Sequence, residues 1–153
     1  MVAMLTGTED FDFSGIIPPL DTVMGWIELV LRVAVMAGPL LLLGFGLLFL
    51  LAPPKEANYG LGFRCWWGMA SLESWQFTQR IAGMVWAGLG AVLTIVMALI
   101  GNGFRDLHPV DMAWRAGTCL IWELVLVVIA WIAINVVVII NFDKDGFRRG
   151  QEE

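Results

Sequence analysis

The sequence predicts an all-α integral membrane protein with three transmembrane helices and a short folded cytoplasmic loop between helices 1 and 2. Hydrophobic residues make up 59% of the 153-residue chain and charged residues only 15%, whereas soluble domains are nearer half apolar and a quarter charged. The apolar excess collects in three blocks, each longer than the ~20 residues that a helix needs to cross a bilayer. These blocks leave no stretch long enough to bury a separate soluble core.

The first block follows an acidic N-terminal tail, residues 1–21, which we expect to be irregular. We predict the first transmembrane helix over residues 22–51. Pro39 lies inside this block and cannot donate a backbone hydrogen bond, so we expect a kink there. Pro53 and Pro54 end the helix because a proline pair cannot continue it.

The rest of the chain holds two more spans. A loop over residues 52–71 leads to a second helix over 72–100, and a third helix follows over 110–140. The three-helix transmembrane domain therefore covers residues 22–142. The remaining residues, 143–153, form a charged C-terminal tail that we expect to be unstructured.

The basic residues predict how the chain is oriented. In a three-span protein the first loop and the C-terminal tail share one side of the membrane. Six basic residues lie on that side: Lys55, Arg64, Arg80, Lys144, Arg148 and Arg149. Only Arg105 and Arg115 lie toward the other side. Because Lys and Arg concentrate in cytoplasmic loops, we expect the N-terminus outside and the C-terminus in the cytoplasm, in the cell membrane.

Three charged residues fall deep within the predicted spans, where charges are costly and normally find partners. Glu28 and Arg32 are four residues apart on one helix and can pair locally. Counted from the starts of their apolar stretches, Arg32 and Glu123 lie at matching depth, so we predict an Arg32–Glu123 contact. Such a polar cluster could join helices 1 and 3, line a pocket for a ligand or partner, or extend to the outer surface.

The second span carries small residues at a spacing of four: Gly83, Ala87 and Ala91. Small residues at this spacing let two helices approach closely. The stripe could serve packing within the three-helix bundle or a homo-oligomer through helix 2.

Several function classes have no support in the sequence. There is no basic face, so we expect no binding to nucleic acid. The apolar spans make the lipid bilayer the expected surrounding partner. Cys65, Cys119 and the single histidine, His108, do not make a four-ligand zinc site, and we expect no metal and no cofactor. No catalytic set can be assembled, so we expect no enzyme.

The most specific feature is the loop together with the start of helix 2. It concentrates glycines, arginines and tryptophans, and it places Ser71 where a helix N-cap is expected. The residues themselves are compatible with a structural cap on the bundle and with a recognition site. Eight residues of this stretch form the motif compared below: Asn58, Gly62, Phe63, Arg64, Ser71, Trp75, Arg80 and Gly83.

This pattern resembles the motif of the SdpI/YfhL family of small bacterial membrane proteins, and the resemblance extends over about residues 25–140. Two departures are visible: Cys65 stands where the family usually has Thr or Ser, and Trp66-Trp67 replaces a frequent Pro. The resemblance implies an immunity protein that protects against, or senses, a membrane-active toxin peptide. The alternative is a small accessory subunit that binds a larger membrane protein complex.

Overall fold

The computed structural model describes residues 19–56 and 60–150, which form three long helices and, within these ranges, no strand. The helices are α1 (Leu20–Leu51), α2 (Leu72–Asn102) and α3 (Pro109–Asn141). Short 3-10 turns, η2 (Trp67–Met69) and η3 (Gly103–Asp106), lie in the two connections. The predicted all-α, three-span fold class is confirmed.

Each of the three helices is long and apolar enough to cross a membrane. The helices have 32, 31 and 33 residues, which at ~1.5 Å per residue is roughly 45–50 Å. The hydrocarbon core of a bilayer is only ~30 Å thick, so the helices must tilt or project beyond it. Their ends lie within two residues of the predicted spans.

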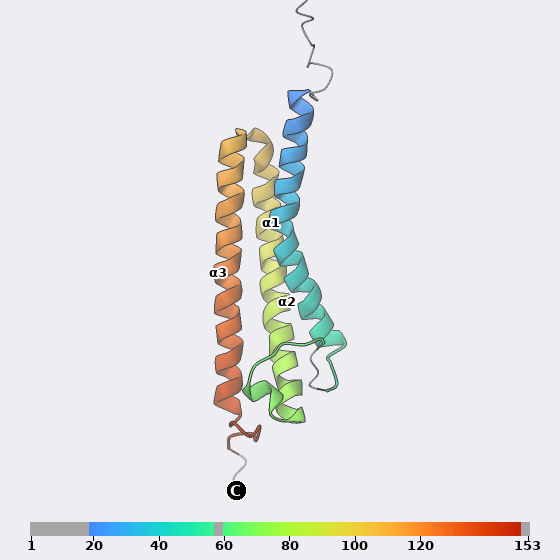
Figure 1. Cartoon of the computed structure of the whole chain (residues 1–153), viewed down its shortest axis with the longest axis vertical. Coiled ribbons are helices and arrows are strands. Elements are labelled where there is room, and N and C mark those ends of the chain that lie inside the picture. The colour runs from blue at the N-terminus through green and yellow to red at the C-terminus, as the bar shows by residue number, and fades with distance from the viewer. Residues whose placement is uncertain (1–18, 57–59, 151–153) are drawn as a thin grey trace, which may run out of the picture.

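The helices form an up-down-up bundle in which α1 and α3 run in the same direction (Figure 1). The α2–α3 connection lies at one end, and the α1–α2 loop and the C-terminal segment lie at the other, here called the cap end. Pro39 lies inside α1. Near its middle α1 changes direction and leans away from α3 toward the cap end, which agrees with the predicted kink (Figure 1).

Close packing of α1 against α2 depends on small residues. A Cβ atom at Gly46 would collide with the backbone of Ala87, and one at Gly83 would lie 3.1 Å from the Gly46 carbonyl oxygen. A Cβ atom at Gly90 would collide with the backbone of Leu43. This part of the small-residue stripe therefore packs within the chain, and a second copy could reach it only by displacing α1.

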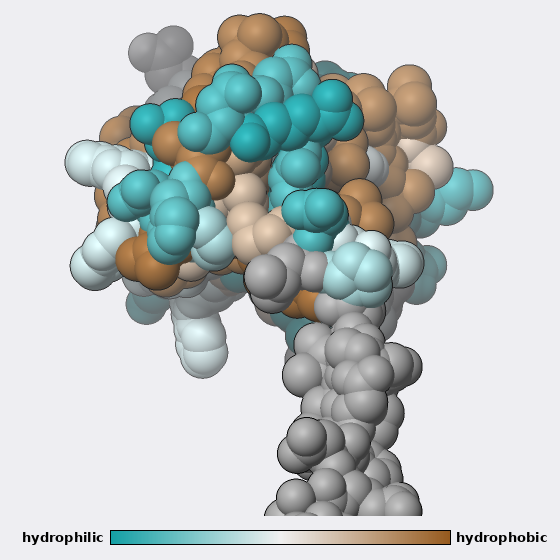
Figure 2. Space-filling model, turned by 90° about the horizontal axis from the view of Figure 1, so that it is seen from above, coloured by the Kyte–Doolittle hydropathy of each residue, from teal (hydrophilic) through white to brown (hydrophobic). Residues whose placement is uncertain are grey.

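The interior contains two hydrophobic clusters, one toward each end of the bundle. Val35, Met97 and Phe104 belong to the cluster near η3, and Phe49 and Ile134 belong to the cluster near the cap end. Large apolar side chains are also exposed along all three helices, as expected for surfaces that face lipid. In Figure 2, hydrophilic residues gather across the middle of the η3 end, and hydrophobic residues lie mostly around its rim.

Candidate functional site

The loop between α1 and α2 folds onto the first turns of α2, and we call the described residues 52–56 and 60–71 the cap. A buried glutamine holds it in place. The backbone N–H of Phe63 donates to Gln79 Oε1, and Gln79 Nε2 donates to the Phe63 carbonyl, both at 2.8 Å. Gln79 thus satisfies both backbone polar groups of a buried loop residue, which would otherwise be costly to bury.

Trp75 ties the cap to the end of α1. Its side chain is fully buried, and its indole N–H donates to the Pro54 carbonyl at 2.8 Å. Gly62 lies directly against the indole ring with a φ of 129°, and a Cβ atom there would come within 2.6 Å of Trp75 Cη2. Glycine is favoured here for two reasons: other residues rarely adopt this φ, and the indole ring leaves no room for a Cβ atom.

Ser71 is the N-cap of α2, as the sequence predicts, and forms a capping box with Ser74. The Ser74 N–H donates to Ser71 Oγ, and the Ser71 N–H donates to Ser74 Oγ, both at 3.1 Å. The Ser71 hydroxyl also donates to the Gly146 carbonyl at 2.7 Å. One side chain therefore joins the start of α2 to the C-terminal segment.

The expectation of an unstructured C-terminal tail is wrong for its described part. Phe142 and Arg148 form an antiparallel β-bridge, and Asp143 Oδ1 accepts hydrogen bonds from two backbone N–H groups within the turn. Gly146 adopts a φ of 80° and packs against Ser71. Asp143 and Gly146, three residues apart, are typical of a turn. The prediction gave more weight to the high charge of the segment.

Cys65 occupies a small buried site in the cap. Burial raises the pKa of its thiol, while hydrogen bonds from the Gly68 backbone and the Thr78 side chain act in the opposite direction. The contact with Thr78 gives a physical reason for a Ser, Thr or Cys here, because all three side chains are small and can form hydrogen bonds.

In contrast to these buried residues, three long side chains in and beside the cap are exposed. Trp66 is 80% exposed, and Arg64 and Arg80 are also exposed. Arg80 lines a small cleft with Glu73 and Arg148. Arginine and tryptophan are the residue types that dominate recognition surfaces, and we call Arg64, Trp66 and Arg80 the cap surface.

The structure thus divides the motif residues. Five of them form internal contacts of the cap or of the α1–α2 interface: Gly62, Phe63, Ser71, Trp75 and Gly83. The two arginines lie on the surface, and Asn58 lies outside the described residues. Gln79 was not among the predicted site residues. Its position four residues after Trp75, on the same face of α2, was the signal that could have found it.

The charges within the predicted spans pair only partly as predicted. Arg32 Nη2 lies 2.7 Å from Glu28 Oε1, which confirms the predicted local pair. Glu28 Oε1 also forms an ion pair with Arg105 of the α2–α3 connection, whose Nε lies 3.3 Å away. Arg32 is therefore engaged at the η3 end of the bundle.

The predicted Arg32–Glu123 contact is wrong, because the two helices are not in the register assumed. Glu123 lies against Gly38, where a Cβ atom would come within 2.7 Å of Glu123 Oε2. Gly38 is six residues beyond Arg32, or ~9 Å along the helix. Figure 1 shows that α1 begins beyond the α2–α3 connection, so counting from the starts of the apolar stretches placed Arg32 too deep.

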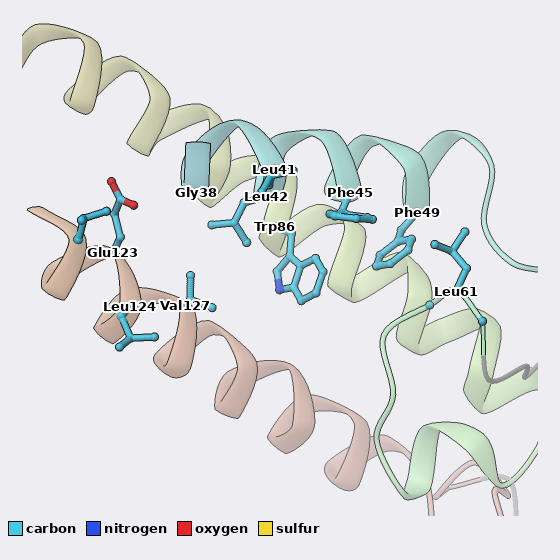
Figure 3. Close-up of a pocket in the computed structure, with 13 residues that line it drawn as sticks. Gly38, Leu41, Leu42, Phe45, Phe49, Leu61, Trp86, Glu123, Leu124 and Val127 are labelled. Carbon is cyan, nitrogen blue, oxygen red and sulfur yellow. The ribbon is translucent and has the colours of Figure 1, made fainter. Parts of the chain in front are cut away.

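Glu123 lies at one end of an apolar cleft of about 590 Å³ between α1 and α3 (Figure 3). The side chain is only 6% exposed, and Glu123 Oε1 has no hydrogen-bond partner within the described residues. The indole N–H of Trp86, which also lines the cleft, is likewise unpaired. The other lining residues are Gly38, Leu41, Leu42, Phe45, Phe49, Gly60, Leu61, Gly62, Leu120, Leu124 and Val127.

Together these features define a multi-pass membrane protein with a folded loop cap and an apolar cleft that has one carboxyl group at its end. A family model described as the SdpI/YfhL protein family matches residues 55–140, which include most of the cap, all of α2 and nearly all of α3. The chain belongs to this family. Comparison with curated proteins and comparison with solved structures each gave no match.

Proposed function

We propose that this SdpI-family membrane protein is a non-enzymatic immunity protein of the bacterial cell membrane, which protects against or senses a membrane-active toxin peptide. The N-terminus would lie outside and the cap and C-terminus in the cytoplasm. Family membership supports the general role. We propose the cap surface, which consists of the motif residues Arg64 and Arg80 together with Trp66, as the recognition site.

The observation that carries this assignment is the division of the motif into buried and exposed residues. Gln79 and Trp75 already hold the cap in one conformation through hydrogen bonds of 2.8 Å. Arg64 and Arg80 are exposed, and their charges can bind phosphates or backbone carbonyls at a membrane surface. A rigid scaffold that presents such side chains loses little entropy on binding.

The experiment compares variants in a strain that lacks the gene and is challenged with the organism's own secreted peptides. Arg64→Ala and Arg80→Ala should each weaken binding of the peptide at least ~10-fold, because a charge-assisted contact contributes ~1.5–3 kcal/mol. Survival should fall accordingly while the protein reaches the membrane at normal levels. Survival and membrane abundance are both measured.

Two tryptophans serve as a matched pair. Trp66→Ala removes an exposed side chain, so abundance should be kept and survival should fall. Trp75→Ala removes a buried one, so abundance itself should fall. Lys55→Ala, at the edge of the motif, should keep both. If the Arg64 and Arg80 variants survive challenge like the unaltered protein, the cap surface has no part in immunity, and the accessory-subunit role becomes the better explanation.

A further inference from the structure

The cleft between α1 and α3 has a polar end that the described residues leave without hydrogen-bond partners. Glu123 Oε1 is buried without a hydrogen-bond partner, and among the described residues no basic side chain lies within 4.0 Å of the carboxylate. Arg32, the basic residue predicted to pair with it, is bound to Glu28. A buried carboxylate without a partner is unfavourable, and a cationic group from outside the chain would supply the missing partner.

The backbone keeps this space open. Gly38 presents no side chain to Glu123, and any Cβ atom there would press on the carboxylate. In its second half, toward the cap end, α1 leans away from α3 (Figure 1). In Figure 3 the side chains of Leu42, Trp86 and Val127 line the space between the helices, and Glu123 stands at its far end from Leu61.

The shape and charge of the cleft select the chemistry of an occupant. Its lining is apolar over the stretch of α1 from Gly38 to Phe49, which is ~16 Å long. An extended alkyl chain of medium length fits such a stretch, and a volume of about 590 Å³ is typical of small-molecule sites. The carboxylate attracts a cation and repels an anionic head group.

We propose that the cleft binds a single-chain amphiphilic amine, with its ammonium group against Glu123 and its alkyl chain along Leu42, Phe45 and Phe49. The ligand enters from the bilayer, between α1 and α3. This site is separate from the cap surface and does not depend on the immunity role. The unpaired indole N–H of Trp86 could donate a hydrogen bond to an acceptor group within the alkyl chain of a natural ligand.

The test measures thermal unfolding of the protein in phosphatidylcholine nanodiscs with three probes of equal chain length: dodecylamine, dodecanol and dodecanoate. Dodecylamine should raise the Tm by ~3 °C or more beyond the effect of dodecanol, because a ligand that binds only the folded state stabilises it. Dodecanoate should give no rise. Equal shifts with the amine and the alcohol would overturn the proposal.

Three variants locate the binding site. Glu123→Gln should make the shifts with amine and alcohol equal, and Val127→Trp, which fills the cleft, should abolish the amine shift. Val128→Trp adds the same side chain at the next, lipid-exposed position and should keep the shift. An amine shift that persists in Glu123→Gln or in Val127→Trp would overturn the site. If Glu123→Gln does not fold, the two tryptophan variants alone decide.

Discussion

Gln79 and Glu123 are both buried polar side chains, but their surroundings give them different roles. Gln79 makes two hydrogen bonds to the Phe63 backbone, so it holds the cap without needing a ligand. Glu123 Oε1 has no partner among the described residues. At the residue scale, satisfied polar groups mark the structural part of the molecule, and the unsatisfied carboxylate marks a candidate binding site.

Replacement of Gln79 should open the cap. Gln79→Leu would leave the buried N–H and carbonyl of Phe63 unpaired, at a cost of roughly 2–4 kcal/mol. Gln76→Leu, on the exposed side of the same helix, should change stability little. The difference is measured as thermal stability in detergent.

Cys65 provides a local measure of the same change. Burial and a raised thiol pKa keep its reactive thiolate scarce in the folded cap, so maleimide labelling near neutral pH should be slow. In Gln79→Leu, exposure returns the pKa toward its ordinary value and labelling should become much faster. The experiment uses a Cys119→Ala background, and unchanged labelling would show that Gln79 does not hold the cap.

At the scale of elements, α1 has two functions that depend on different residues. Its glycines allow it to lie directly on α2, where Gly46 contacts the backbone of Ala87. Near its middle, α1, which contains Pro39, changes direction, and its second half leans away from α3 (Figure 1). The cleft lies between these two helices. Tight packing on one side and separation on the other therefore arise within a single helix.

Two glycines of α1, two positions apart, test this packing. Gly46→Ala forces a Cβ atom against the Ala87 backbone, so it should destabilise the bundle by roughly 1–3 kcal/mol. Gly44→Ala meets no atom within 4 Å and should be neutral or slightly stabilising. Thermal unfolding in detergent distinguishes the two, and equal losses of Tm would refute a close α1–α2 contact at Gly46.

At the scale of the whole molecule, charge is distributed unequally between the two ends. The cap and the C-terminal segment, which are joined by the Ser71–Gly146 hydrogen bond, lie at the same end. The cap carries Arg64 and the C-terminal segment carries Arg148, and Arg80 lies in the α2 turns beside them. At the η3 end, Arg105 is partly neutralised by Glu28.

This asymmetry predicts that the cap end faces the cytoplasm. A reporter fused after Glu153 should be active only in a form that works in the cytoplasm, and a reporter at the N-terminus only in a form that works outside. The reverse pattern of activity would place the cap on the outer surface and invert the proposed orientation.

The sequence by itself determined the number, length and order of the helices. Apolar blocks longer than a bilayer core have few alternatives to helix, and prolines and Ser71 mark where helices begin and end. The motif also located the cap, and the i, i+4 spacing identified the Glu28–Arg32 pair. These features depend on neighbours in the chain, so they can be read locally.

Only the tertiary structure decided how the elements meet. The register of α1 against α3 depends on how far α1 projects and where it bends, and it placed Glu123 opposite Gly38 instead of Arg32. The Gln79–Phe63 and Ser71–Gly146 contacts join residues 16 and 75 positions apart. The spacing along α2 can place Gln79 on the same face as Trp75, but it does not identify Phe63 as its partner. Which residues meet across such distances depends on how whole segments pack and not on the spacing of residues along one of them.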